Sequence, residues 1–186
     1  MSAVFTIGHS NHSLARFLEL LAGAGIEMVA DVRSAPVSRH APQFNKAALS
    51  KSLHGAAISY AFLGRELGGR PADPALYTDG IADFERMART TLFREGLKRV
   101  TTDALWLRVA LMCSEKDPLD CHCCLLAGRA LAENGHDVRH ILADGGMIAQ
   151  KDIESELLAA HGGLAFEEDA VAAAYRERAR KIAFRR

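Results

Sequence analysis

Short apolar runs alternate with amphipathic stretches along most of the chain, and this pattern constrains the fold more than any other feature of the sequence. Apolar runs of strand length separated by segments of helix length are typical of βα units, which build a parallel sheet. We therefore predict one α/β domain of three layers, in which a mostly parallel, Rossmann-like sheet is flanked by helices. The predicted strands are Val4–Ile7, Ile26–Val32, Ala57–Phe62, Ala104–Cys113 and Val138–Leu142.

Helices are predicted between these strands from apolar periodicity and from residues that favour helix ends. Residues 64–80 contain four glycines and two prolines, which predicts a long irregular loop. The last predicted helix carries many charges, and we expect it to face solvent or a partner. One helix is predicted to begin after the cap Ser13, and a short helix is predicted to follow Asn45. The other predicted helices are Ile81–Val100, a helix from the cap Asp120 to Glu133, Ile153–His161 and Glu168–Ala183.

Charge and hydropathy disfavour several classes of protein. The 186 residues hold 23 basic and 23 acidic side chains, a zero balance that is unusual for a general polyanion binder. No apolar run reaches the length of about 18 residues that a membrane span needs, and the N-terminus lacks the basic start of a signal peptide. All four cysteines fall between positions 113 and 124, which is typical of reduced thiols. We therefore expect a cytoplasmic protein without a membrane partner.

Polar side chains recur where the predicted strands end. In a parallel sheet these ends meet at one edge, and α/β proteins bind ligands there. Arg33 follows the second strand, and its planar guanidinium suits a phosphate or a carboxylate; Asp31 is expected to pair with it. The ligand-binding candidates are Ser10, Asp31, Arg33, Arg39, Gly68, Gly69, Arg70 and His122.

The segment LMCSEKDPLDCHCC, residues 111–124, carries the richest chemistry. It is predicted to form the end of a strand, a tight polar loop and the start of a helix. The first turn of a helix offers unpaired N–H groups and a partial positive charge, which bind anions and lower a thiol pKa. Cys121 is therefore a candidate thiolate, although thiols at such positions also serve in packing alone. The catalytic candidates are Cys121, Glu115, His9 and Cys113.

Other interpretations of these residues remain open. Cys121 and Cys124 form a C-x-x-C pair, the arrangement of dithiol redox sites, but the pair comes late in the chain. Structural zinc usually needs two well-spaced ligand pairs, and the chain has no second such pair, so no metal and no other cofactor is predicted. A nucleic-acid-binding or regulatory module is another alternative, although interleaved aromatic residues for base stacking are lacking. Its basic candidates are the tail ERARKIAFRR, residues 177–186, and Arg33, Arg39, Lys46, Arg65 and Arg70.

Five ordered motifs resemble the DUF488 family, a group of bacterial and archaeal proteins of unknown function. They are TIGHSNHSLARFLELL, MVADVRSAPVSRHAPQFNK, ISYAFLGRELGG, ALMCSEKDPLDCH and HDVRHILADG, and they cover residues 3–145. The resemblance implies a compact α/β domain whose loops form one polar pocket, and it leaves residues 150–186 as a helical C-terminal extension. The residues of this chain that match the family motifs are Gly8, His9, Ser10, Asp31, Arg33, Pro36, Ser38, Arg39, Leu67, Gly68, Gly69, Cys113, Glu115, Pro118, Cys121 and His122.

One departure from the family pattern affects the expected charge of the pocket. Members of the family usually have an arginine directly after the Cys-His pair, where this chain has Cys123. The resemblance therefore implies one positive charge fewer at the helix start. It also implies that the C-x-x-C pair arises from this one replacement.

These patterns together predict an enzyme-like pocket for a small anionic molecule, such as a nucleotide or another phosphorylated metabolite. Arg33 and Arg39 are expected to bind the anion beside the helix that starts at Cys121. Hydrolysis or group transfer is the expected class of reaction, with Cys121, Glu115 and His9 as its reactive groups. A nucleic-acid-binding module and a Cys-based redox or metal site are the alternatives.

Overall fold

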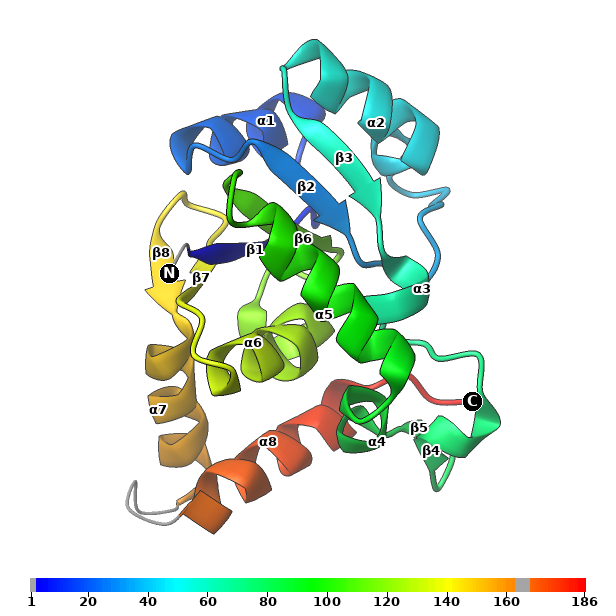
Figure 1. The fold of residues 1–186 in the computed structure, drawn as a ribbon, viewed down its shortest axis with the longest axis vertical. Coiled ribbons are helices and arrows are strands. Elements are labelled where there is room, and N and C mark those ends of the chain that lie inside the picture. The colour runs from blue at the N-terminus through cyan, green and yellow to red at the C-terminus, as the bar shows by residue number, and fades with distance from the viewer. Residues whose placement is uncertain (1–2, 163–167) are drawn as a thin grey trace.

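The computed structural model describes residues 3–162 and 168–186, and it confirms the predicted α/β fold. A six-stranded sheet has the strand order β3-β2-β6-β1-β7-β8 (Figure 1). All neighbouring strands are parallel except β8, which pairs antiparallel with β7. The strands are β1 (Val4–Gly8), β2 (Met28–Asp31), β3 (Ser59–Phe62), β6 (Val109–Cys113), β7 (Val138–Ile141) and β8 (Met147–Ala149), and β4 (Tyr77–Thr78) and β5 (Ile81–Ala82) form a separate hairpin.

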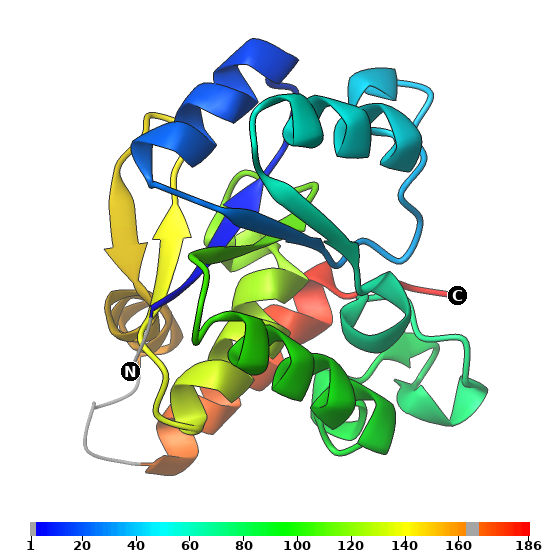
Figure 2. The same cartoon turned by 45° about the horizontal axis from the view of Figure 1, so that its top comes forward.

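Helices cover both faces of the sheet, which gives the three predicted layers. Helices α1 and α2 lie on one face, and α5, α6 and α8 lie on the other (Figure 2). The central strand β6 alternates between the two cores, because Ala110 and Met112 pack towards α1 while Val109, Leu111 and Cys113 pack towards the opposite face. The helices are α1 (Leu14–Gly23), α2 (Lys46–Gly55), α3 (Gly64–Leu67), α4 (Phe84–Ala88), α5 (Thr91–Asp103), α6 (Arg129–Glu133), α7 (Gln150–His161) and α8 (Glu168–Ile182).

Local capping explains where the predicted helices were right and where one of them was wrong. The Ser13 side chain accepts a hydrogen bond from the backbone of Arg16 and caps α1, as predicted. The single helix predicted over residues 81–100 is instead β5, α4 and α5. Asp83 caps α4, and Thr90 caps α5 by accepting from the backbone N–H of Phe93. Two internal caps therefore divide the segment.

Four further predictions need correction. The strand predicted over residues 104–113 begins only at Val109, because α5 continues to Asp103. The loop predicted over residues 64–80 contains α3 and β4, and the short strand β8 was missed. Asp120 does not cap the following helix. Asp117 caps a short 3-10 turn, η3 (Pro118–Asp120), and the Asp120 carboxylate instead pairs with Arg178.

One face of the C-terminal helix α8 packs into the core, while residues 171–173 and 176–182 are half-buried or exposed, as expected of a surface helix. Tyr175 is fully buried in the packed face, and Ala170 and Ala174 are also buried. The tail after α8 runs towards the β4–β5 hairpin (Figure 1), where the backbone N–H of Ala82 donates to the carbonyl of Phe184. The predicted extension, residues 150–186, includes residues 163–167, which lie outside the described residues. No helix in the described part of the chain is long and apolar enough to cross a membrane.

Candidate functional site

A cleft of about 520 Å³ lies at the carboxyl edge of the sheet. Its lining comes from the segments that follow β1, β2 and β6, from the start of the helix after Cys121 and from the C-terminal tail. The cleft therefore lies at the edge where the strand ends predict a ligand site. Among the lining residues are His9, Ser10, Arg33, Ser34, Arg70, Ser114, Glu115, His122 and Phe184.

A buried ion pair fixes one wall of the cleft, and it confirms the predicted pairing of Asp31 with Arg33. The guanidinium binds the Asp31 carboxylate with two hydrogen bonds, from Nε at 2.9 Å and from Nη2 at 2.7 Å. Nη2 also donates to the Phe44 carbonyl, and Tyr60 donates its hydroxyl to Asp31 at 2.9 Å. Arg33 is 5% exposed and Asp31 is fully buried. The pair is thus part of the architecture of the site.

His9 completes this wall and is held in one tautomer. Its Nδ1 donates to the Ser10 carbonyl at 2.9 Å, and its Nε2 accepts from Nη1 of Arg33 at 3.2 Å. Burial and the neighbouring guanidinium lower the pKa of His9, so the ring is neutral. Both ring nitrogens are used within the wall, and four of the five N–H groups of Arg33 are also used. One Nη1–H remains for a ligand.

The backbone at the end of β1 is drawn close to the loop after β6. A side chain at Gly8 would overlap the carbonyl of Glu115, which explains the glycine. Ser10 has a φ of 45°, in the left-handed region that non-glycine residues rarely adopt, and its N–H donates to the Ser114 carbonyl at 2.8 Å. Strained residues of this kind cluster at functional sites. Ser10 lies in the lining of the cleft.

The thiols of Cys113 and Cys121 lie together in the buried interior. Their Sγ atoms are 2.6 Å apart, and each residue is 2% exposed. Cys121 directly precedes His122, the N-cap residue of η4 (Cys123–Gly128). The Cys121 carbonyl accepts from the backbone N–H of Leu125, and its Sγ accepts from the backbone N–H of Cys123 at 3.3 Å. The Glu115 carboxylate lies 3.6 Å from Cys121 Sγ and lines the cleft. The predicted helix-start environment of Cys121 is therefore present.

The protonation of this group differs from residue to residue. Hydrogen bonds from the thiols of Cys121 and Cys123 outweigh burial and lower the pKa of Cys113 to about 6. Burial and the nearby Cys113 raise the pKa of Cys121, and burial raises the pKa of Glu115. Although burial lowers the pKa of His122, its contacts with Cys121, Glu115 and the Val32 carbonyl raise it overall. At neutral pH the thiol pair therefore holds its negative charge on Cys113.

The same residues offer two sets of metal-binding atoms. The Sγ atoms of Cys113, Cys121 and Cys123 all lie within 4.8 Å of one another, and so do ligand atoms of Glu115, Cys121 and His122. Cys124 belongs to neither set, because its thiol lies against the Gln150 side chain at 3.8 Å. The close sulfur partner of Cys121 is thus Cys113, and not the Cys124 of the C-x-x-C pair.

The remaining predicted residues occupy different places around the cleft. Gly69 packs against the His122 ring, and a side chain at Gly68 would strike Ser34, so both glycines allow close packing beside the site. Arg70 lines the cleft with its guanidinium over the Phe184 ring, 4.7 Å from the centroid. Arg39 is exposed and lies outside the described lining of the cleft.

Ser34 and Phe184 are among the lining residues that the sequence argument missed. Ser34 accepts a hydrogen bond from the Arg70 backbone at 2.9 Å and so joins the loop after β2 to the loop after α3. Phe184 comes from the C-terminal tail, 70 or more residues after most of the other lining residues. The polarity of Ser34 at a strand end was a usable signal, whereas the position of Phe184 depends on backbone pairing with β5.

Comparison with known protein families supports the resemblance seen in the motifs. The model of one family, described as a domain of unknown function, DUF488, matches residues 13–130. The matched region includes the segments that contribute Arg33, Arg70, Glu115 and His122 to the cleft, whereas the segment with Phe184 lies beyond it. No curated protein and no solved structure matches the chain.

Proposed function

This chain belongs to the DUF488 family, whose function is unknown, and we propose that its cleft binds a small anionic substrate for hydrolysis or group transfer. One observation carries the proposal: the polar cleft at the sheet edge is lined by Glu115, whose carboxylate lies 3.6 Å from the buried thiol of Cys121 at a helix start. The helix start favours negative charge because its N–H groups point outward.

Three groups supply positive charge or donors to an anion in the cleft. Arg70 is exposed along its lining, Arg33 keeps one Nη1–H, and His122 has a raised pKa that favours its charged form. In this proposal Arg70 is the main ligand-binding cation, and the ion pair with Asp31 makes Arg33 a secondary one. His9 is a positioning residue that holds Arg33.

Cys121 is the proposed nucleophile. Its sulfur attacks the electrophilic atom of the substrate, its proton passes to the Glu115 carboxylate at 3.6 Å, and the leaving group takes that proton as the bond to it breaks. Water then releases the group in hydrolysis, or a second substrate accepts it in transfer. The neighbouring Cys113 accepts a hydrogen bond from Cys121 and raises the pKa of that thiol, so removal of the Cys121 proton depends on Glu115.

The basic C-terminal segment is part of the nucleic-acid alternative. Several of its arginine side chains bind other residues of the same chain. Arg178 binds Asp120, Arg180 binds Asp79 at 3.1 Å, and Arg186 stacks over Tyr77. Side chains engaged in this way are less available to phosphates of a nucleic acid. A small anion is therefore the favoured ligand.

We expect Arg70→Gln to weaken binding of the anion. A thermal-shift screen with inorganic phosphate, nucleotides and sugar phosphates would identify a stabilising ligand for the wild-type protein. Loss of a charge-assisted hydrogen bond of about 1.5–3 kcal/mol corresponds to at least about a tenfold loss of affinity. Calorimetric titration of the stabilising anion into both proteins measures this loss.

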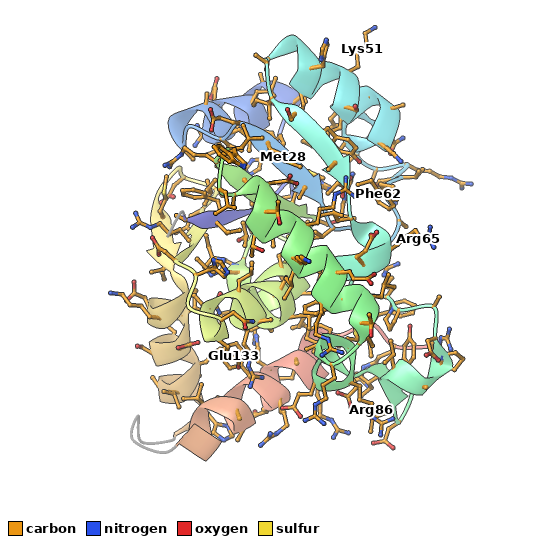
Figure 3. The ribbon with its side chains drawn as sticks, viewed as in Figure 1. Met28, Lys51, Phe62, Arg65, Arg86 and Glu133 are labelled. Carbon is orange, nitrogen blue, oxygen red and sulfur yellow. The ribbon has the colours of Figure 1, made fainter. Side chains whose placement is uncertain are left out.

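Arg65→Gln is the matched control. Arg65 lies in α3, five residues before Arg70, and its exposed side chain extends outward in Figure 3, outside the described lining of the cleft. This variant should bind the anion like the wild-type protein. Equal affinity in all three proteins would remove Arg70 from the site.

A further inference from the structure

We infer that Cys113 and Cys121 form a reversible disulfide, which makes this buried pair a dithiol redox centre. Their Sγ atoms are 2.6 Å apart. Cys113 is the last residue of β6, paired with Gly8 in the sheet, and Cys121 holds the helix start. Both ends of the bridge thus lie on ordered backbone.

The observed spacing lies nearer to a disulfide than to a metal centre. A disulfide joins sulfur atoms at about 2.05 Å, so the pair would close by a fraction of an ångström. A tetrahedral zinc with Zn–S bonds of about 2.3 Å keeps its sulfur ligands about 3.8 Å apart. To bind zinc, the two sulfur atoms would therefore have to move farther than they would to form a disulfide. The third thiol, Cys123, stays close enough to stabilise the Cys113 thiolate through a hydrogen bond.

The oxidant in this proposal is a hydroperoxide. The Cys113 thiolate attacks the terminal peroxide oxygen, the O–O bond breaks, and the departing alkoxide or hydroxide takes a proton from solvent, which gives a sulfenic acid on Cys113. Cys121 sulfur then attacks the Cys113 sulfur while the Cys121 proton passes by way of Glu115 to the departing hydroxide, so that the S–S bond forms and water leaves. The two thiols supply two electrons to the peroxide, and a dithiol reductant reverses the change.

The lowered pKa of Cys113 supports the first step, because the group that attacks the peroxide must be a thiolate at neutral pH. The disulfide would also remove the proposed nucleophile, so oxidation would switch the site off. That consequence rests on the proposed function, whereas formation of the disulfide does not.

Peptide mapping of the oxidised wild-type protein tests the inference directly. The reduced full chain is treated with hydrogen peroxide, its remaining thiols are alkylated, and it is digested with trypsin. Cleavage after Arg108, Lys116 and Arg129 separates Cys113, in residues 109–116, from Cys121, in residues 117–129. We expect these two peptides to be joined, free thiols to fall from four to two, and dithiothreitol to restore all four.

Single variants identify the sulfur atoms. Cys124→Ser and Cys123→Ser should keep the joined peptides, and Cys121→Ser should lose them. Four alkylated thiols after oxidation, a joined pair that persists in Cys121→Ser, or a bound metal that protects three thiols would each overturn the inference. The mapping needs no anionic ligand, so its outcome is separate from that of the Arg70→Gln titration.

Discussion

Asp31→Ala should lower the free energy of unfolding by about 3–5 kcal/mol, the cost typical of breaking a buried ion pair. The substitution leaves the Arg33 guanidinium, which is 5% exposed, without its two-point partner, and it also removes the acceptor of the Tyr60 hydroxyl. A buried positive charge without a partner is far less stable than the same charge in water. Urea unfolding followed by circular dichroism measures the change.

An exposed pair on the same fold provides the control. Glu19→Ala breaks the pair between Arg16 and Glu19, whose side chains are 39% and 66% exposed, and should cost less than about 1 kcal/mol. Replacing Asp31 and Arg33 together by leucine and methionine should be less harmful than Asp31→Ala alone, since no charge is then left buried. Similar losses for Asp31→Ala and Glu19→Ala would show that the buried pair does not hold this wall of the cleft.

The second large effect is a loss of stability in mild acid that depends on His140. This fully buried residue accepts from the Thr6 hydroxyl at Nδ1 and donates from Nε2 to Gln150, which donates to the Tyr175 hydroxyl. Burial lowers the pKa of His140 from 6.5 to about 4. The unfolded chain therefore takes up a proton below pH 6.5 that the folded protein takes up only near pH 4.

The stability that His140 contributes is thus present above pH 6.5 and is lost as the pH falls towards 4. Between pH 7 and pH 5 this amounts to about 2 kcal/mol. We expect His140→Gln to be less stable than the wild-type protein at pH 7, with a difference that shrinks by this amount at pH 5. Urea unfolding at both pH values measures it, with the exposed His54→Gln as the control. A difference that stays constant would contradict the buried neutral state of His140.

The sequence predicted most of the sheet because strands β1, β2 and β6 are buried on both faces and so appear as largely apolar runs. The strand β8 has only three residues, none of them fully buried, and such a segment carries no apolar pattern. The burial of Tyr175 in α8 depends on Gln150 and Glu154 of α7, with which its hydroxyl forms hydrogen bonds. Periodicity within α8 does not contain that information.

The site was predictable to the extent that the ends of parallel strands meet. This rule brought His9, Arg33 and Glu115 to one edge, and all three line the cleft. The pairing of Arg33 with Asp31 was also predicted, but the further hydrogen bonds from Arg33 to His9 and to the Phe44 carbonyl were not, because they depend on side-chain geometry. The approach of Cys113 to Cys121 could not be predicted either, since it requires the exact path of the loop between them.

The most direct test of the central claim is a crystal structure of the protein with the anion that stabilises it most. We predict density for the anion in the cleft at the carboxyl edge of the sheet, in contact with Arg70 and next to the wall that contains Glu115 and Cys121. An anion bound elsewhere on the protein, with this cleft holding only solvent, would contradict the proposed function.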